Sequence, residues 1–367
     1  MHAAPSQSAP RLTVRSLQAV GVEVPMTYAL GTSRGAITKA PLLLIDLDTE
    51  EGATGHSYLF CYVRDAAPAI ASILKEVERV AKGQAVAPVE LWARLAQRFA
   101  LIGVQGIVRM AMSGFDVACW DALAKAAGLP LVRLLGGEPK PIRAYNSCGL
   151  GLMAAEAVAD EAEKLARGFT AVKLRLGYPT LADDLAALHA VRRRIPDVTV
   201  MVDYNQALTL AQARERGRAL DQEGIYWLEE PIRHDDYAGA ASLARELVTP
   251  IQIGENFSEA TAMGAALAAG ACDYVMPDLE RIGGVTGWLN AAALAHARRI
   301  EMSSHLFPEV SAQLLAATPT RHWLEWVDWA ERILEAPLRL ADGFATASDR
   351  PGNGLAWNHD AVARYRM

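Results

Sequence analysis

VTVMVDYN, residues 198–205, is a short apolar run that carries an acidic side chain, Asp203, near its end. Two further runs of the same kind, IYWLEEP and IQIGEN, carry Glu229 and Glu255, each 26 residues after the one before. A strand with its crossover helix takes roughly 25 to 30 residues, because a barrel of eight such units has ~250 residues. The spacing therefore predicts alternating strands and helices, with an acidic group at the end of three successive strands.

The same pattern extends to both sides of this stretch. The run AVKLRLG carries Lys173 before it, and the runs DYVMPD, IEMSSH and HWLEW carry Asp278, His305 and Glu325 after it. In a barrel of parallel strands, the catalytic groups come from the carboxyl ends of several strands. We therefore expect all seven side chains to converge on one pocket of an α/β barrel.

The remainder of the chain is long enough for a second domain. The 367 residues exceed one barrel by about 100, and 51% apolar with 21% charged residues is typical of a globular enzyme with a large core. Residues 11–62 show strand patterns, with a hairpin around EEGATG, whereas residues 65–100 and 104–127 show helical periodicity. The last of these helices should end at Gly128, with Pro130 just beyond it. Strands followed by helices predict a separate α+β domain.

Two segments are expected to lie outside this regular structure. YALGTSRGAITKAP, residues 28–41, holds two glycines and little periodicity, which predicts a loop. Residues 341–367 are rich in glycine and aspartate, which predicts a surface return outside the barrel.

The composition argues against several classes of protein. A net charge of −6 and a pI near 5.8 disfavour nucleic-acid binding, because such proteins carry basic faces. No run reaches 18 apolar residues, so no membrane span is expected. The first residues lack the charged-then-apolar order of a secretory signal. No C-x-x-C pair is present, and we expect a cytoplasmic protein with reduced, mostly buried thiols at Cys61, Cys119, Cys148 and Cys272.

Asp203, Glu229 and Glu255 are candidate metal ligands. Three carboxylates on neighbouring strands repel one another unless a cation neutralises them. Oxygen-only ligands select a hard divalent ion such as Mg²⁺, and the sequence has no H-x-H pair of the kind that a zinc barrel would use. The alternative is that these carboxylates cap the following helices. Strand alternation lets only one of Glu229 and Glu230 face the pocket, and their positions alone do not choose between them.

Asp278 and His305 are a candidate dyad, one strand–helix unit apart. A carboxylate beside an imidazole fixes its tautomer and raises its basicity, which gives a base that is usable near neutral pH. The alternative is a hydrogen-bonded structural histidine. Glu325 lies within an apolar run, so we expect a buried carboxyl with a raised pKa that donates a hydrogen bond while protonated. The alternative for Glu325 is a surface ion pair.

Basic and hydroxyl side chains near the first strands suit a carboxylate substrate. Lys173 and Arg175 are two residues apart and share one face of a strand. Lysine can carry a proton when its pKa falls, whereas arginine, with a pKa above about 12, is a poor proton carrier. Ser147, within AYNSCG, is either a hydrogen-bond donor to a substrate carboxylate or a turn hydroxyl.

VMVDYNQ, WLEEP, IGEN, MPDLERIGGVTGW, SSHLFPEVSAQLLAATPT and HWLEW together resemble the enolase superfamily, and within it the mandelate racemase group. The similarity covers nearly the whole chain, since APLLLIDL and GHSYLF near the start also match. The resemblance implies an α+β capping domain over residues 1–135 and a modified (β/α)7β barrel over residues 136–340. Residues 341–367 would form a return segment that packs against the cap.

The resemblance also assigns a role to each candidate. It implies Mg²⁺ held by the three carboxylates, with Glu229 chosen over Glu230. The base would be His305, oriented by Asp278, and Glu325 would act as the electrophile on the substrate carboxylate. Together these groups would remove the α-proton of a 2-hydroxycarboxylate and leave an enediolate. The remaining candidates would contact the substrate: Lys173, Ser147, Asn205 and Tyr58.

One residue departs from the pattern of the group in a way that bears on the reaction. These proteins usually carry K-x-K on the second barrel strand, and the second lysine is the opposing base. Here the motif is Lys173-Leu174-Arg175. Racemisation needs proton exchange on both faces of the α-carbon, whereas dehydration needs one base and an acid, and His305 can serve as both. The sequence therefore favours a sugar-acid or hydroxy-acid dehydratase, with a racemase or epimerase as the alternative.

A second departure lies in residues 28–38, a capping loop that is largely apolar in the group. Arg34 lies within it. If Arg34 points into the pocket, the substrate has a polar or anionic far end, and the alternative is a solvated arginine. A catalytically silent, acid-binding barrel is a further reading, but the Asp278–His305 pair argues against it. The resemblance also implies a homo-oligomer, often an octamer.

Overall fold

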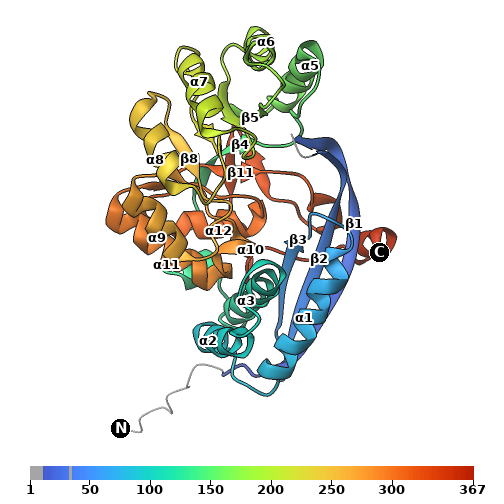
Figure 1. Cartoon of the computed structure of the whole chain (residues 1–367). Coiled ribbons are helices and arrows are strands. Elements are labelled where there is room, and N and C mark those ends of the chain that lie inside the picture. The colour runs from blue at the N-terminus through green and yellow to red at the C-terminus, as the bar shows by residue number, and fades with distance from the viewer. Residues whose placement is uncertain (1–10, 33–34) are drawn as a thin grey trace, which may run out of the picture.

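The computed structural model describes residues 11–32 and 35–367. A sheet of three antiparallel strands, covered by helices, lies beside a barrel of parallel strands that is ringed by helices (Figure 1). We call the first part the capping domain and the second part the barrel. This arrangement confirms the predicted fold class.

The sheet of the capping domain contains β1 (Val14–Thr32), β2 (Gly35–Thr49) and β3 (Thr54–Phe60) in that order. The predicted hairpin around EEGATG is confirmed, because β2 and β3 pair on either side of it. The prediction of a loop over residues 28–41 is wrong. There β1 and β2 pair up to their ends, with a shift of register between Pro25 and Leu30. Pairing between the two strands satisfies their backbone groups, and side-chain periodicity does not reveal it.

Three longer helices and one short turn complete the capping domain: α1 (Ala66–Ala81), α2 (Pro88–Phe99), α3 (Gly106–Ala126) and α4 (Leu131–Leu134). The helical pattern over residues 65–100 is therefore two helices. Gly83 has φ +75°, and Pro88 begins the second helix, where its missing N–H leaves no partner unsatisfied. The predicted end of the third helix is confirmed, since Gly128 follows α3 with φ +67°.

Eight parallel strands form the barrel within the described part of the chain, and their order around the barrel is their order in the sequence. They are β4 (Pro141–Asn146), β5 (Ala171–Arg175), β6 (Thr199–Asp203), β7 (Leu228–Glu229), β8 (Ile251–Ile253), β9 (Tyr274–Val275), β10 (Glu301–Met302) and β11 (Leu324–Trp326). The ring closes because β11 pairs with β4, and Met302 N donates a hydrogen bond to the Thr320 carbonyl at 2.9 Å.

Helices connect the successive barrel strands, as a parallel sheet requires. They are α5 (Ala155–Leu165), α6 (Leu181–Arg194), α7 (Leu210–Leu220), α8 (Tyr237–Glu246), α9 (Ala260–Ala269), α10 (Leu279–Ile282), α11 (Gly284–Arg298) and α12 (Pro308–Ala317). Helix α12 connects β10 to β11, the last barrel strand. The barrel as described therefore has seven strand–helix units followed by one strand, the (β/α)7β pattern.

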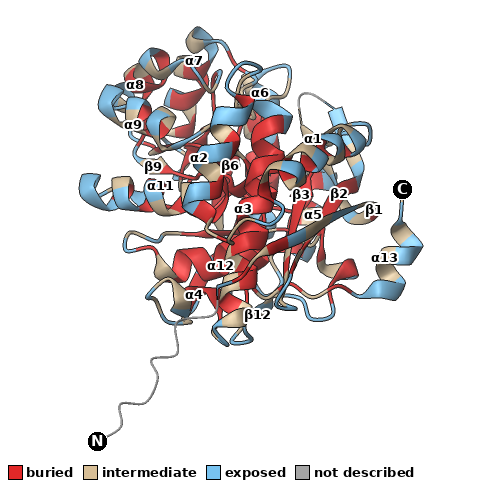
Figure 2. Ribbon diagram, turned by 90° about the horizontal axis from the view of Figure 1, so that it is seen from below, coloured by how far each residue is buried: buried red, intermediate tan, exposed pale blue. Residues whose placement is uncertain are grey.

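Helix α3 joins the capping domain to the barrel and is buried along most of its length (Figure 2). The Asp116 carboxylate accepts hydrogen bonds from Thr286 N at 2.9 Å and from Thr286 Oγ1 at 2.6 Å, at the start of α11. Trp120 Nε1 donates to the same hydroxyl at 3.0 Å. On the opposite side, Ser57 Oγ of β3 donates to the Gly114 carbonyl at 2.6 Å. The helix therefore fixes the cap sheet relative to the barrel.

Gly55 is expected to be indispensable to this packing. A Cβ at Gly55 would overlap the carbonyl oxygen of Ala118 in α3, and a helix backbone cannot give way locally. We expect Gly55→Ala to lower the free energy of unfolding by about 3 kcal/mol, the upper range for overpacking. The control is Gly264→Ala in α9, where the nearest atom beyond the helix backbone is 3.6 Å away. That change should raise stability by roughly 0.5–1 kcal/mol. Urea unfolding measures both, and equal effects would contradict this view of the α3 contact.

The C-terminal segment contacts both parts of the molecule. It contains β12 (Arg339–Ala341), β13 (Phe344–Thr346) and α13 (His359–Tyr365), after the short 3-10 turn η1 (Glu331–Ile333). Strand β13 pairs antiparallel with β4 of the barrel. Met367 N donates to the Gly21 carbonyl of β1 at 3.0 Å, so the end of the chain lies against the cap sheet (Figure 1).

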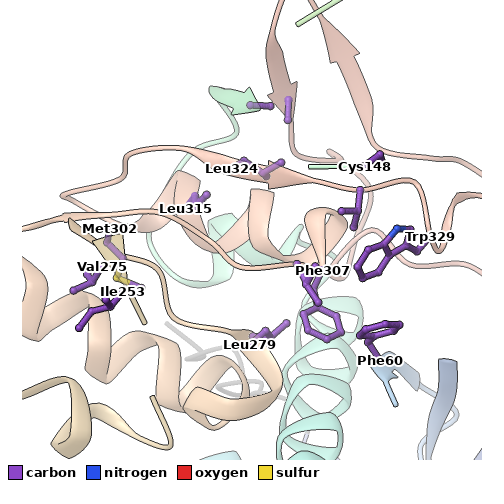
Figure 3. Close-up of a cluster of buried hydrophobic side chains, with 14 of the residues drawn as sticks. Phe60, Cys148, Ile253, Val275, Leu279, Met302, Phe307, Leu315, Leu324 and Trp329 are labelled. Carbon is purple, nitrogen blue, oxygen red and sulfur yellow. The ribbon is translucent and has the colours of Figure 1, made fainter. Parts of the chain in front are cut away.

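Aromatic side chains fill the junction between cap and barrel. Phe60 at the end of β3 lies next to Trp329 from the barrel, with ring centroids 4.7 Å apart, and Phe307 packs nearby (Figure 3). The four cysteines are buried free thiols, as predicted. Among residues 11–32 and 35–367, every helix is too short or too polar to span a bilayer.

Candidate active site

A cavity of about 440 Å³ lies at the carboxyl ends of the barrel strands, where the capping domain covers them. The cap contributes mostly apolar walls, whereas the barrel contributes charged groups and amides. The cap side is formed by Leu30, Thr32, Gly35, Ala36, Ile37, Phe60, Tyr62 and Val63. The barrel side is formed by Lys173, Arg175, Asp203, Asn205, Gln206, Glu255, Asn256, Arg281, His305, Leu306, Glu325 and Trp329.

The structure brings together the seven side chains that the spacing singled out. Five of them line the cavity: Lys173, Asp203, Glu255, His305 and Glu325. The other two lie directly behind this layer. Glu229 Oε1 is 2.7 Å from Lys173 Nζ, and Asp278 Oδ2 is 2.6 Å from His305 Nδ1.

Lys173 is the cation at the centre of the acidic groups. Its Nζ lies 2.7 Å from Glu229, 2.8 Å from Glu325 and 3.3 Å from Asp203. Its side chain is only 1% exposed, so water does not screen these contacts. Burial lowers the pKa of Lys173, but the charges of Glu229 and Glu325 raise it by more. The net result is a pKa well above the ordinary value. Lys173 is therefore a fixed positive charge at the floor of the cavity.

Asp203, Glu229 and Glu255 supply an all-oxygen donor set. Asp203 and Glu229 are paired residues on neighbouring strands, and such strands lie about 4.8 Å apart. In the part of the chain that the structure describes, no three acidic or histidine groups converge with metal-ligand spacing, and Lys173 contacts two of these carboxylates. Their carboxylate oxygens are the donor type that a hard divalent cation prefers.

Glu229 and Glu230 point in different directions, although both are buried. Glu229 Oε1 contacts Lys173, and Trp227 Nε1 donates to its Oε2 at 3.0 Å. Glu230 has φ +37° and accepts from Asn256 Nδ2 at 3.0 and 3.2 Å. Burial raises the pKa of Glu229 to about 8, against the opposing effect of Lys173. Burial beside Asp203 and Glu325 therefore makes the ionised form of Glu229 costly, and a further cation would favour that form.

His305 lies between two carboxylates. Asp278 Oδ2 holds His305 Nδ1 at 2.6 Å, which leaves Nε2 facing the cavity, 3.2 Å from Glu255 Oε2. Burial lowers the pKa of His305, but Glu255, Glu325 and the bond with Asp278 raise it well above the ordinary value. The imidazole therefore carries a proton in this charge environment, and Asp278 fixes which nitrogen exchanges it.

Glu325 is an ionised acceptor, and the expectation that it is protonated is wrong. Its Oε1 accepts from Ser147 Oγ at 2.7 Å and contacts Lys173 Nζ at 2.8 Å, while its Oε2 accepts from Leu306 N at 2.8 Å. Burial raises the pKa of Glu325, but Lys173 and His305 lower it by more, so that the pKa is about 2. The prediction was based on burial alone. The groups whose effects outweigh burial, Lys173, His305 and Ser147, are 20 or more residues away in the sequence.

Arg175 is a buried guanidinium held by neutral acceptors. Its Nη1 donates to the Ser147 and Gly149 carbonyls at 3.2 and 2.7 Å, and its Nη2 donates to Ser147 Oγ at 3.2 Å. Its Nε has no hydrogen-bond partner among the described residues. No described carboxylate lies within ion-pair distance of Arg175. In all three bonds Arg175 is the donor and a neutral oxygen is the acceptor, so the guanidinium is fixed in place as a hydrogen-bond donor.

The structure places the four proposed substrate contacts in different surroundings. Asn205 lines the cavity and donates to Asp203 Oδ2 at 2.9 Å. Ser147 lies behind the wall, where it is fully buried and donates to Glu325, so it does not line the cavity. Tyr58 also does not line the cavity, since its hydroxyl donates to Glu309 Oε2 at 2.7 Å and its ring packs on Phe307. Lys173 is described above, and Arg34 lies outside the described residues.

Tyr62, Arg281 and Trp329 are among the cavity residues that were not singled out from the sequence. Tyr62 follows strand β3 by two residues and has φ +60°, which turns the chain towards the barrel. It has the same strand parity as Tyr58, and that parity was the only signal that could have suggested it. Arg281 lies three residues after Asp278, a helical separation that places its side chain near the same end of the barrel.

Comparisons with protein families agree with this architecture. Residues 15–136 match the model of the mandelate racemase / muconate lactonizing enzyme N-terminal domain. Residues 157–361 match the model of the enolase C-terminal domain-like family. The two matches together cover the cap, the barrel and most of the C-terminal segment.

Several known proteins are similar over nearly the whole chain. L-Talarate/galactarate dehydratase of Salmonella typhimurium is 30% identical over 329 residues, which cover 89% of this chain and 82% of that protein. An enolase from alpha proteobacterium bal199, solved with bound Mg, is 43% identical with a TM-score of 0.95, over 97% of this chain and 100% of that one. An enolase from Bradyrhizobium, complexed with magnesium and mandelic acid, is 42% identical with a TM-score of 0.93, over 98% and 100% of the two chains.

Proposed function

Because the chain belongs to the mandelate racemase / muconate lactonizing enzyme family of the enolase superfamily, we propose that it uses His305 to remove the α-proton of a 2-hydroxycarboxylate and then expels water. The chain is an enzyme of this superfamily. The state of Arg175 is the observation that carries the choice of dehydration. A guanidinium that donates to two carbonyls and a hydroxyl, on a side chain whose ordinary pKa is above about 12, is a poor second base to accompany His305.

We assign Mg²⁺ to Asp203, Glu229 and Glu255. Their oxygen donors and their position at the ends of successive strands support this assignment. When bound, Mg²⁺ supplies positive charge beside the substrate oxygens on which negative charge develops. The similar enolases solved with magnesium are consistent with this choice. Lys173 adds a second, fixed positive charge at the same end of the cavity.

His305 performs both proton transfers in this proposal. Its Nε2 is directed into the cavity by the bond between Nδ1 and Asp278. With Glu255 committed to Mg²⁺, that carboxylate would no longer hold a proton on Nε2, which would then take the α-proton and leave an enediolate. The bond from the β-carbon to its hydroxyl then breaks, and the same Nε2 returns the proton to the departing oxygen as water. The enol that remains becomes a 2-keto acid. Atoms balance, because the acid loses one hydrogen and one hydroxyl as water.

The relatives suggest acids with which to test the proposal. Galactarate and L-talarate carry the 3-hydroxyl that dehydration needs, and mandelate lacks it. Incubation with MgCl₂ in D₂O, followed by NMR, separates the outcomes. A 2-keto product from a sugar acid supports dehydration. Deuterium at the α-carbon with inversion and no keto product would overturn it in favour of the racemase.

Racemisation is the second candidate, because a similar enolase binds mandelic acid. Arg175→Lys tests the two directly. We expect this variant to gain exchange with inversion, roughly 10²-fold above the parent, because lysine can lose a proton where arginine cannot. Arg216→Lys is the matched control, since Arg216 is a buried arginine paired with Asp184 outside the cavity. Efficient inversion by the parent, lost in Arg175→Lys, would show that Arg175 is itself a base.

A further inference from the structure

The one-turn helix α10 (Leu279–Ile282) links the dyad to the rest of the site. Asp278 caps it, because its Oδ1 accepts from Glu280 N at 2.8 Å and from Arg281 N at 3.0 Å. The other oxygen of the same carboxylate holds His305 Nδ1. The orientation of His305 and the first turn of α10 therefore depend on one side chain. Glu280 and Arg281, which lie in this turn, point in different directions.

Arg281 reaches towards Glu255. Its Nη1 donates to the Glu255 carbonyl at 3.1 Å, to Glu255 Oε1 at 3.3 Å and to Asn256 Oδ1 at 3.1 Å. A planar guanidinium that meets both main chain and side chain fixes the rotamer of the carboxylate as well as its place. Glu255 thus lies between Arg281 on one side and His305 Nε2 on the other.

The same guanidinium lies on a ring of the capping domain. The Cζ of Arg281 is 4.8 Å from the centre of the Tyr62 ring, within the range of a cation–π contact. Tyr62 does not itself hydrogen-bond to Glu255, because its buried hydroxyl has no partner among the described residues. Arg281 is therefore the physical connection between the cap and Glu255.

Glu280 makes a second connection between α10 and the cap. Its side chain is buried, and its Oε2 accepts from Phe60 N at 3.1 Å, at the end of β3. Phe60 lies two residues before Tyr62, and their rings are 4.5 Å apart. This contact holds the segment that carries Tyr62 against α10, so that the ring and the guanidinium meet.

We propose that Arg281 is a positioning residue through which the seating of Tyr62 sets the affinity of the barrel for Mg²⁺. The proposal rests on the assignment of Glu255 as a magnesium ligand. Arg281 holds the Glu255 carboxylate in place, and Tyr62 holds Arg281. A substitution in the cap should therefore weaken metal binding, although it alters none of the three carboxylates.

Calorimetric titration of MgCl₂ into the metal-free full-length protein, without substrate, tests this coupling. The variants are Arg281→Lys, Tyr62→Leu and the double variant. Lysine keeps the positive charge but cannot reach three acceptors, so a change reports geometry rather than charge. We expect about 10-fold weaker binding for Arg281→Lys, the lower range for partners of metal ligands. Tyr62→Leu should weaken it about 3-fold, as loss of a cation–π contact would. The double variant should match Arg281→Lys.

Controls separate this inference from the proposed function and from unfolding. Arg216→Lys removes the fork of a buried arginine elsewhere and should leave Mg²⁺ affinity unchanged. If the parent protein binds no Mg²⁺, the metal site itself is wrong. If the parent binds and Arg281→Lys binds equally well, only the positioning role is overturned. Effects of Tyr62→Leu that persist in full in the Arg281→Lys background would overturn the link between the two residues. Tyr62→Leu alone decides the matter should Arg281→Lys fail to fold.

Discussion

His305→Asn is expected to lower kcat by roughly 10²–10⁴-fold, the range that a positioned acid–base group contributes. Asparagine keeps a donor for Asp278 Oδ2, which His305 Nδ1 contacts at 2.6 Å, but it cannot take up a proton. Exchange of the α-hydrogen and formation of the keto acid should fall together, because one imidazole serves both steps. NMR in D₂O with MgCl₂ measures both for whichever acid of the test panel is turned over.

A second buried histidine provides the control. His322 contacts Tyr226 at 2.8 Å, just before β11, at the opposite end of the barrel from the cavity. Burial lowers its pKa to about 4, so it is neutral at pH 7. His322→Asn should keep kcat within a small factor, although it can reduce stability. Exchange that survives in His305→Asn while the keto product disappears would show that another group removes the α-proton.

The barrel was predictable because its period is set by geometry. Each strand is short and buried, and each connection must contain a helix, so the runs that carry Asp203, Glu229 and Glu255 recur at nearly constant spacing. The charge state of the site was not predictable in the same way. Glu325 was expected to be protonated on grounds of burial, but its pKa depends on Lys173, which lies on β5, and on His305, which lies in the segment after β10.

The residues at the cap–barrel boundary show a second limit. Tyr58, within β3, and Tyr62, two residues after it, have the same strand parity, and the sequence gives no reason to prefer either as a cavity residue. The choice depends on Glu309, which lies 251 residues after Tyr58 and accepts its hydroxyl. Likewise, Glu230 leaves the pocket because its own backbone turns, with φ +37°, after a strand of only two residues. Such local bends have no periodic signal.

Lys173→Met is expected to affect both stability and activity. The side chain is 1% exposed and contacts Glu229, Glu325 and Asp203 within 3.3 Å, so methionine would leave three buried carboxylates without their common cation. Removing one partner of a buried ion pair costs about 3–5 kcal/mol. Loss of a fixed positive charge near the developing enediolate should lower kcat by roughly 10²–10³-fold. Urea unfolding in EDTA and the deuterium assay measure the two effects.

The pH dependence distinguishes loss of this charge from a simple packing defect. The pKa of Glu325 is about 2 in the folded protein, against an ordinary value of 4.5, and Lys173 is the strongest influence that lowers it. A lowered folded pKa contributes stability that is present above about pH 4.5 and lost as the pH falls towards 2. The difference between parent and Lys173→Met should therefore be largest at neutral pH and shrink on acidification. A cavity or packing defect would cost the same at every pH.

Lys125→Met is the control for Lys173→Met, because Lys125 also pairs with a buried carboxylate, Asp121, at 2.6 Å. It lies in the capping domain, away from the cavity, so its loss should reduce stability without lowering kcat beyond the unfolded fraction. If both variants lose stability and both keep kcat, Lys173 serves only to neutralise the buried acids. If only Lys173→Met loses kcat, the Lys173 ammonium also stabilises the negative charge that forms on the substrate.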